Sequence, residues 1–371
     1  MIFPRISVRI IIPLHRKGPV ARASMAEKIT IYTIAEETGL TPTAVSRAFN
    51  PSSRLDPEKR RLVLETAAKY GFTPNRMASR LSMREIKIGI IIYAGYMPFC
   101  EQIIAGIESA KRRMTDYKIN CDLRLLPREN VTREECVKVL RELVDGGCEG
   151  IITSGMYDWS YPELKKAADM GCRVVFINYP PEPGVSLFSS MQNAPLAGRI
   201  AADFMRAAGK KSTLLLTGYQ TMTLHRQVMR GFLDLAAEYG MSVPEIYDIN
   251  SLPHADREEA LTDLLTRLRG EIDSVYITSG ESAELCRVIE WLFAPGELTV
   301  LTSDIYPELC RYIESGLVSA TIFQNQAKQA ERAYELLAGY LMKTIPEPEN
   351  VEITPVLVTR SLLPCYSGFR T

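Results

Sequence analysis

Beyond residue 85, short apolar runs alternate with longer segments in which apolar residues recur every three or four positions. The runs have the length of buried strands and the periodic segments that of amphipathic helices. This pattern therefore predicts parallel β-sheets covered by helices on both faces. Predicted strands lie at 88–93, 118–126, 150–153, 173–177, 212–217, 274–278 and 298–302, with a strand-like stretch at 351–360. Because these are too many strands for one small sheet, we expect two similar lobes that change over near 209–211.

Residues 25 to about 85 lack this strand pattern and carry the start and stop signals of three short helices. A hydroxyl or carboxylate side chain can cap a helix, and a proline directly after it loses no hydrogen bond. The signals are Thr30, Thr41-Pro42 and Asp56-Pro57 at the starts, with Gly39 and Gly71 at two of the ends. Two short helices joined by a glycine-bearing turn form a helix-turn-helix, but the spacing alone fits a generic three-helix bundle equally well.

Helical periodicity also predicts which side chains of these helices face the solvent. In the second helix, at 42–49, the residues expected toward the core are Ala44, Val45 and Phe49, and those expected outward are Thr43, Ser46 and Arg47. In the third helix, the predicted inner stripe is Leu62, Val63, Thr66, Ala67 and Tyr70.

Composition narrows the class of protein. The 371 residues are 46% apolar, which is enough to bury a large core, and the chain is too long for a single ordinary domain. No apolar run approaches the roughly 20 residues that span a bilayer. Lys plus Arg equal Asp plus Glu at 44 each, so net charge neither favours nor excludes nucleic acid. The 8 cysteines form no CxxC pair and there are 3 histidines, so we expect an intracellular chain without a metal site.

The first 24 residues are basic and contain no acidic side chain. Their apolar run at 8–14 is short and is interrupted by Arg9 and Pro13, which argues against a secretion signal. We predict a disordered basic extension, or a translation start at Met25.

Motifs for catalysis are missing from the sequence. The stretch IGIIIYAGYMPF at the first strand lacks the phosphate-binding glycines of GxGxxG, and neither GxSxG nor HExxH occurs. We therefore expect neither an enzyme nor a bound cofactor.

The segment 30–81 resembles the DNA-binding region of the lactose-repressor (LacI/GalR) family. The resemblance rests on TIYTIAEETGLTPTAVSRAFN at 30–50, YGF at 70–72 and PNRMASRL at 74–81. It continues more weakly through the rest of the chain, which resembles periplasmic sugar-binding proteins as the family's core does. The resemblance implies a cytoplasmic, nucleoid-associated transcription regulator, in most of the family a repressor.

The partners that this resemblance implies are double-stranded DNA and a small carbohydrate-like effector. Some family members form tetramers through a leucine heptad, and no such heptad follows residue 360, so a homodimer is expected. A two-fold dimer implies a pseudo-palindromic operator. Whether effector binding releases or promotes DNA binding is not encoded in an identifiable motif.

Ten positions match DNA contacts of the family. They are Pro42, Thr43 and Arg47 at base edges, Thr30, Tyr32, Ser46, Asn50 and Asn75 at phosphates or sugars, and Ala78 and Leu81 in the hinge helix. Arg47 can pair with guanine through two hydrogen bonds, and Leu81 matches a leucine that wedges between base pairs in the minor groove. The alternatives are helix capping for Thr30 and Asn50, and a plain linker for the hinge.

Positions that match effector contacts lie around the strand ends where such folds bind ligands between two lobes. The matches are Phe99, Asn193 and Asp304, and the looser candidates are Ser154, His225, Arg226, Ser279, Glu281 and Gln324. A basic ligand-binding residue of the family falls on Val228 here, so either Arg226 has taken its role or the contact is absent. The carboxylate of Asp304 could accept two sugar hydroxyl hydrogen bonds, but it could also cap the helix predicted at 307–315.

These predictions divide the chain into four parts. They are the extension 1–24, a helix-turn-helix domain at 25–72, a hinge at 73–85 and an effector-binding and dimerisation domain at 86–371. Lobe 1 is expected at about 86–209 and 323–345, and lobe 2 at 210–322 and 346–371. The alternative function is a solute-binding protein of a sugar transporter, whose fold suits the two lobes but has no place for residues 30–81.

Overall fold

The computed structural model describes residues 29–49, 53, 55–72, 84–127, 131–154, 160–220 and 222–369. The chain divides into two compact units, residues 1–75 and 76–371. No helix among the described residues is long and apolar enough to span a lipid bilayer. The predicted extension and four predicted DNA contacts lie outside the described residues: Asn50, Asn75, Ala78 and Leu81.

The first unit contains the helices α1 (Ile31–Thr38), α2 (Pro42–Ala48) and α3 (Pro57–Lys69). Their caps form as the sequence predicts: the Thr41 hydroxyl accepts from the backbone N–H of Ala44 at 3.2 Å, and Asp56 accepts from two N–H groups of the first turn of α3. Gly39 ends α1 with φ = 66°, a conformation that costs a residue without a Cβ little. A small core holds the helices together and consists of Ile34, Ala35, Val45, Ala48 and Val63.

The inner face of α3 differs from the prediction at one position. Val63 and Ala67 are buried, but Leu62 is 45% exposed. Successive residues of an α-helix point about 100° apart, so a stripe centred on Val63 and Ala67 leaves Leu62 at its margin. Assigning Leu62 to the core was therefore wrong.

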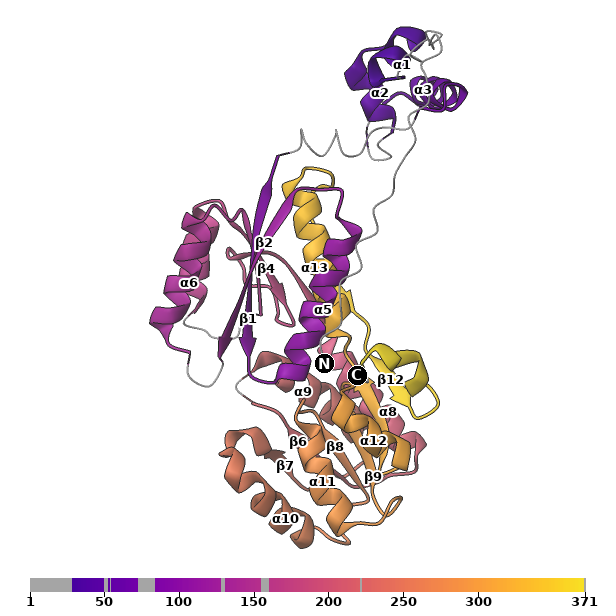
Figure 1. The fold of residues 1–371 in the computed structure, drawn as a ribbon. Helices are drawn as coiled ribbons and strands as arrows, with labels where there is room; N and C mark the ends of the chain where they lie inside the picture. Colours follow the sequence, from indigo (N-terminus) through magenta and orange to yellow (C-terminus); the bar gives the residue numbers. More distant parts are fainter. Residues whose placement is uncertain are drawn as a thin grey trace, which may run out of the picture. The chain divides into compact units, whose positions relative to one another are not determined.

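The second unit confirms the predicted two-lobed α/β architecture (Figure 1). The sheet of lobe 1 has the strand order β11-β5-β4-β3-β1-β2, and every neighbouring pair is parallel. Its strands are β1 (Ile86–Ala94), β2 (Ile119–Pro127), β3 (Gly150–Thr153), β4 (Arg173–Ile177), β5 (Ser186–Gln192) and β11 (Val351–Ile353).

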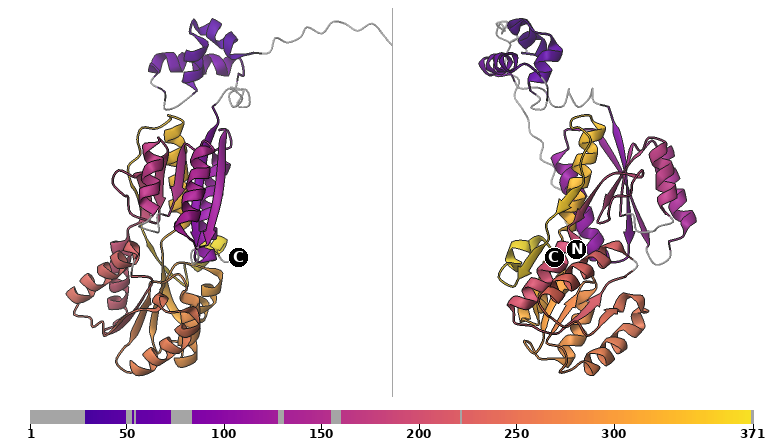
Figure 2. Two further views of the ribbon diagram at one scale, coloured as in Figure 1. Left: turned by 90° about the vertical axis from the view of Figure 1, so that its left-hand side faces the viewer. Right: turned by 180° about the vertical axis from the view of Figure 1, so that it is seen from behind.

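Helices cover both faces of this sheet (Figure 2). On one face lie α5 (Met97–Arg113) and α13 (Gln326–Leu341), and on the other α6 (Arg133–Asp145) and α7 (Tyr161–Asp169). Alternate residues of β1 serve the two faces: Ile88 and Ile90 pack with α5 and α13, and Ile91 packs with α6 and α7. A strand buried on both faces reads as a continuous apolar run, which explains why β1 was predictable.

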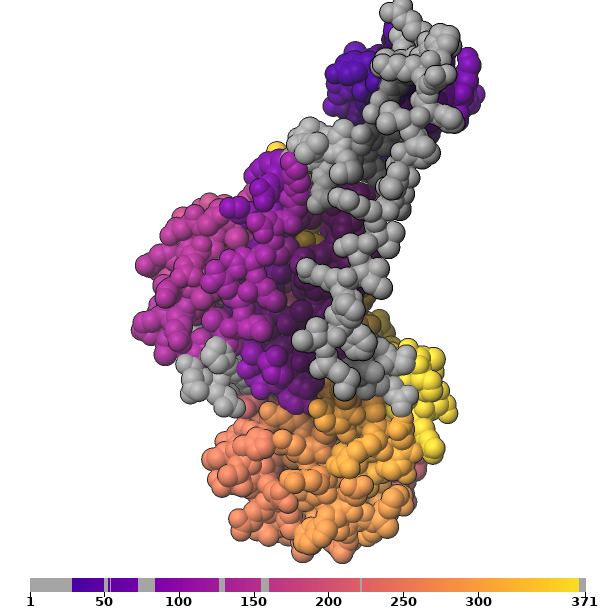
Figure 3. Space-filling view, viewed as in Figure 1, coloured from indigo at the N-terminus to yellow at the C-terminus, as the bar shows by residue number. Residues whose placement is uncertain are grey.

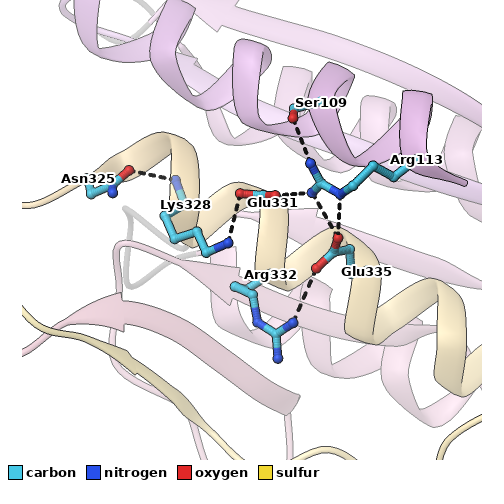
Figure 4. A network of polar contacts seen from close by, with 7 residues as sticks. All are labelled: Ser109, Arg113, Asn325, Lys328, Glu331, Arg332 and Glu335. Carbon is cyan, nitrogen blue, oxygen red and sulfur yellow. Dashed lines mark hydrogen bonds and ion pairs between the residues drawn. The ribbon is translucent and has the colours of Figure 1, made fainter. Parts of the chain in front are cut away.

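Helices α5 and α13 come from distant parts of the sequence but are tied side by side. Arg113 at the end of α5 forms ion pairs with Glu331 and Glu335 of α13 and donates to the Ser109 hydroxyl at 2.9 Å (Figure 4). A Cβ on Gly106 would lie 2.1 Å from the carbonyl oxygen of Ala327, so only glycine permits this close approach.

Lobe 2 repeats the plan with the strand order β12-β10-β9-β8-β6-β7, parallel except for the edge strand β12. Its strands are β6 (Thr213–Thr217), β7 (Ile246–Asp248), β8 (Ser274–Ile277), β9 (Thr299–Ser303), β10 (Val318–Phe323) and β12 (Val356–Thr359). Helices α8 (Ala194–Ala207) and α9 (Thr223–Glu238) cover one face, and α10 (Arg257–Arg267), α11 (Ser282–Leu292) and α12 (Pro307–Ser315) cover the other. Short 3₁₀ turns lie at η2 (Ile249–Ser251), η3 (His254–Asp256) and η4 (Leu363–Phe369).

The chain passes between the lobes after β5, after β10, and between β11 and β12. Helix α8 packs on α9 and belongs to lobe 2, because the alanines of its inner stripe contact the α9 side of that sheet. The predicted change near 209 was therefore wrong, and the crossover lies between Gln192 and Ala194.

The stretch 351–360 was assigned wholly to lobe 2, and this too was wrong. It divides into β11 of lobe 1 and β12 of lobe 2. Pro355 lies between them and cannot donate to a strand ladder, which is consistent with the break at this point.

Candidate functional site

The outward face of α2 carries the polar residues that the sequence placed there. Thr43, Ser46 and Arg47 are exposed, whereas Val45 and Ala48 are buried. On α1, Tyr32 is 70% exposed, and Thr30 at its cap is exposed too. The backbone carbonyl of Arg47 accepts from the Ser53 hydroxyl at 2.5 Å, which ties the end of α2 to the following loop. The unit thus presents a short capped helix whose free polar face holds an arginine.

A second candidate site lies where the lobes meet. Parallel strands of both sheets end there in polar side chains, and ligands of open α/β folds bind at such carboxyl ends. These residues are Ser154 after β3, Asn178 after β4, Gln192 at the end of β5, Thr278 and Ser279 after β8, Asp304 after β9 and Gln324 after β10. All of them are buried.

Part of this region is closed by the protein's own side chains. Gln102 of α5 donates from Nε2 to the carbonyl oxygen of Ile305 at 2.7 Å, a bond between the lobes. The ring of Tyr96, at the start of α5, packs edge-on against that of Tyr306 with centroids 5.0 Å apart. Burial and the nearby carboxylate of Glu308 raise the pKa of Tyr96, so its hydroxyl stays neutral. Atoms of lobe 1 and lobe 2 are in direct contact in the space-filling view (Figure 3).

Asp304 lies at the centre of a buried hydrogen-bond network. Its carboxylate accepts from Gln324 Nε2 at 2.6 Å, from the Gln324 backbone N–H at 3.3 Å and from the Tyr306 hydroxyl at 3.1 Å. Tyr306 in turn accepts from Gln326 Nε2 at 3.2 Å. Asp304 has φ = 70°, a left-handed conformation that is costly for a residue with a Cβ.

Helix capping by Asp304 was one of two predicted roles, and the structure contradicts it. The N-cap of α12 is Tyr306, and Asp304 accepts from the side chains named above instead. The reason is geometric: two residues separate Asp304 from the first turn, so its carboxylate turns to the crossover after β10.

Asp304 should make stability depend on pH in an unusual direction. Burial raises the pKa of Asp304 from 3.8 to about 6, despite the hydrogen bonds that lower it. Between pH 4 and 6 the folded chain therefore holds this proton and the unfolded chain does not, so this group's contribution to the free energy of unfolding falls as pH rises. The full loss, reached above pH 6, is about 3 kcal/mol.

Replacing Asp304 by asparagine should remove this dependence. We expect the free energy of unfolding, measured by urea denaturation from pH 4 to 7, to lose the falling contribution in Asp304→Asn relative to the parent chain. Parallel curves for the two proteins would show that the carboxylate titrates normally.

Several other predicted effector residues are engaged within the protein. Asn193 caps α8 through Leu196 N–H at 2.9 Å, Glu281 pairs with Arg257, and Phe99 packs at the margin of the lobe 1 core. Arg226 is exposed and donates to the Gln220 carbonyl at 2.8 Å. The Ser279 hydroxyl accepts from the Glu281 N–H at 3.2 Å. A direct role for these residues in ligand binding stays a prediction.

The structure does bring His225 and Gln324 together. Both line a cavity of about 30 Å³ between the lobe 2 sheet and the helices α8 and α9. A larger hollow of about 350 Å³ runs along α6, but its lining comes from that one helix, so it is an open surface groove. Ser154, the remaining predicted contact, is buried at the end of β3.

Comparison with known proteins places the chain in a family. Residues 88–344 match the family model described as periplasmic binding protein domain. Catabolite control protein A of Priestia megaterium is 25% identical over 233 residues, covering 59% of this chain and 64% of that protein. The ribose operon repressor of Haemophilus influenzae is 20% identical over 337 residues, covering 89% of this chain and 97% of that protein. The lactose operon repressor of Escherichia coli is 23% identical over 192 residues, or 51% of each chain.

The chain belongs to the lactose-repressor family, with a periplasmic-binding-protein domain as its larger part. Solved structures agree on the fold of that part. A putative LacI transcriptional regulator from Bacteroides fragilis superposes with a TM-score of 0.66 at 12% identity, covering 76% of this chain and all of that one. A solute-binding protein from Burkholderia graminis in complex with D-arabinose gives 0.67 at 18%, covering 76% and 98%.

Sequence reasoning missed four polar residues of the cavity in this LacI-family chain. They are Gln192, Tyr276, Thr278 and Ser303. Tyr276 could have been identified from the sequence, because it is the one large side chain with a polar group in the strand SVYI. Gln192 and Ser303 could not have been identified in this way, since β5 was not predicted and serine at the end of a strand is common.

Proposed function

We propose that this LacI-family chain is a sequence-specific DNA-binding repressor whose operator affinity is controlled by a small carbohydrate-like effector. The proposal rests on the presence of two different parts in one chain. One is a capped helix pair, α1 and α2, with Thr43, Ser46 and Arg47 exposed, and the other is a periplasmic-binding-protein domain. Two of the relatives similar to this chain are operon repressors by name.

In this proposal α1 and α2 form a helix-turn-helix and α2 is the helix that enters the major groove. Arg47 reads guanine, Thr43 and Pro42 contact neighbouring bases, and Thr30, Tyr32 and Ser46 contact the backbone. A homodimer would place two such helices on the halves of a pseudo-palindrome. The chain acts in the cytoplasm, where its DNA lies.

The effector in this proposal binds where the lobes meet, and the buried polar side chains at the strand ends suit a hydroxyl-rich molecule. A coupling of a few kcal/mol between effector and operator would suffice for regulation. The contacts of Gln102 and Tyr96 with lobe 2 are candidates for what the effector shifts.

Selection of DNA from a random pool by the full chain, followed by sequencing, tests this function. We expect enrichment of a pseudo-palindrome whose retention changes when a sugar from a panel is added. Solute-binding proteins share the fold, and they supply the competing function. Sugar binding without any retained DNA sequence, in the presence or absence of every sugar, would favour that function and contradict ours.

A further inference from the structure

The small cavity in lobe 2 is a built polar site rather than a packing defect. Its apolar wall comes from α8 and α9 and from Ile322 of β10, and its polar wall from α9, from the ends of β8 and β9, and from two of the segments that join the lobes. The polar members are Gln192, His225, Tyr276, Thr278, Ser303 and Gln324. Gln192 ends the last strand before the first crossover and Gln324 follows the strand before the second, so the cavity reaches the segments that join the lobes.

Two polar atoms of this lining are buried without a normal hydrogen bond. Among the described residues, neither the Tyr276 hydroxyl nor Gln324 Oε1 has a hydrogen-bond partner. Ser303 comes close enough to Tyr276 to oppose the rise that burial causes in the pKa of its hydroxyl, yet no bond of normal geometry joins them. Buried tyrosine hydroxyls and amide oxygens nearly always find partners, so both atoms are suited to a polar group inside the cavity.

The polarity of the Gln324 amide is fixed. An ionised carboxylate only accepts hydrogen bonds, so Gln324 must point Nε2 at Asp304, at 2.6 Å, and its oxygen away from it. The backbone N–H of Gln324 donates to the same carboxylate. Asp304 is 2% exposed and its two oxygens already accept these bonds and that of Tyr306. Asp304 therefore orients an acceptor toward the cavity and has little capacity left for a ligand.

His225 is held in place by a glycine. A Cβ on Gly218 would lie 2.4 Å from His225 Cε1, so the imidazole packs directly over the backbone at the end of β6. This places an imidazole ring at the cavity wall.

Size and hydrogen-bonding character together restrict what can occupy the cavity. A volume of about 30 Å³ holds one or two water-sized groups, far less than a sugar ring. Gln324 Oε1 needs a donor, and the Tyr276 hydroxyl can donate to an acceptor. A ligand hydroxyl does both and can take the place of a water molecule there, whereas an ammonium group only donates and a carboxylate only accepts.

We propose that this cavity, the hydroxymethyl subsite, receives a hydroxymethyl arm of the effector, and that Asp304 is a positioning residue that acts through Gln324 without touching the ligand. The inference rests on the proposed sugar-responsive function and names the part of the effector that the chain recognises. In this proposal the amide oxygen of Gln324 makes the ligand contact that the sequence predicted for the Asp304 carboxylate.

Matched sugars that differ only in this arm test the subsite. D-Xylose is D-glucose without its hydroxymethyl group, and L-arabinose is D-galactose without it. In calorimetric titrations of the full chain we expect the hexose of at least one pair to bind about 10-fold more tightly than its pentose, the value of one or two buried neutral hydrogen bonds. Equal affinities within both pairs, or no binding of any of the four sugars, would overturn the proposal.

Single-residue variants test which side chains cause the preference for the hexose over the pentose. Tyr276→Phe and Asp304→Asn should each reduce the hexose-to-pentose ratio toward one, because the first removes a donor and the second frees the Gln324 amide to rotate. Thr302→Val, on the neighbouring strand, also removes a fully buried hydroxyl but does not line the cavity, and it should keep the ratio of the parent chain. An unchanged ratio in Tyr276→Phe would contradict the subsite, and an unchanged ratio in Asp304→Asn would contradict the positioning role.

DNA retention by the same preparations separates the two levels of the proposal. If the chain retains a pseudo-palindrome but binds hexose and pentose equally, the subsite is contradicted and the proposed repressor function is not. Loss of both DNA retention and sugar binding in a folded protein would remove the function itself.

Discussion

Replacing Arg47 by alanine is expected to lower the ratio of operator to random-sequence DNA affinity by about 10-fold to 100-fold, the range of one bidentate arginine–guanine contact. Arg47 is exposed on α2, one turn after the helix start that Thr41 caps through the Ala44 N–H, and the Ser53 hydroxyl donates to the Arg47 carbonyl. A guanidinium presents its donors in a rigid planar fork, so from this exposed position it can pair with a guanine edge through two hydrogen bonds. Competition binding at one salt concentration measures the ratio.

Arg61→Ala provides the matched control in the same unit. The Arg61 side chain is 72% exposed on α3 and faces Glu65 at 3.6 Å. Its loss should weaken binding to all sequences equally or leave it unchanged, because charge alone carries no sequence information. If Arg47→Ala also weakened both kinds of DNA by the same factor, Arg47 would be a phosphate contact and α2 would not read bases through it.

Replacing Gly231 by alanine is expected to destabilise the larger unit by about 3 kcal/mol, the upper part of the usual range for overpacking. A Cβ on Gly231 would lie 2.1 Å from the Pro195 carbonyl oxygen, and one on Gly198 would lie 2.0 Å from the Val228 carbonyl oxygen. The two glycines thus let α8 and α9 pack backbone against backbone. Main-chain atoms cannot turn aside as a side chain could, so the helices must separate.

The urea midpoint of the larger unit, followed by far-UV circular dichroism, measures this effect. Gly280→Ala is the control, because a Cβ there would lie 3.5 Å from its nearest neighbours, an ordinary contact. We expect a clear fall in the midpoint for Gly231→Ala and little change for Gly280→Ala. Equal midpoints in the two variants would show that the α8–α9 interface can relax at low cost.

The parts of the fold that could be predicted depend on signals between neighbouring residues. Thr41-Pro42 and Asp56-Pro57 begin α2 and α3 where the capping rules place them. Strand β1 was visible as an uninterrupted apolar run. By contrast, β5 was missed because its sequence SLFSSMQ is rich in serine. Ser189 and Ser190 are nonetheless buried, and the backbone N–H of Ser189 donates to Asn350 at 2.8 Å, a partner 161 residues away.

The same limit applies to the candidate site. Asp304 was identified at the right strand end, but its partner Gln324 follows the next strand, β10, and Gln326, which donates to the Tyr306 hydroxyl of the same network, begins α13. The periodicity of α8 showed an apolar stripe without showing which lobe it would cover. Which lobe a helix joins, and whether a carboxylate meets ligand or protein, are decided by contacts between segments far apart in the chain.

The interleaved path of the chain through the two lobes has a consequence for its synthesis. Strand β11 completes the edge of one sheet and β12 the edge of the other, and both come from residues 351–359. A ribosome adding about 5–20 residues per second therefore releases neither sheet in finished form until this stretch has emerged. Until then β5 and β10 present open edges of the kind that pair with other chains. A nascent chain stalled before residue 351 should accordingly depend on chaperones for both lobes at once.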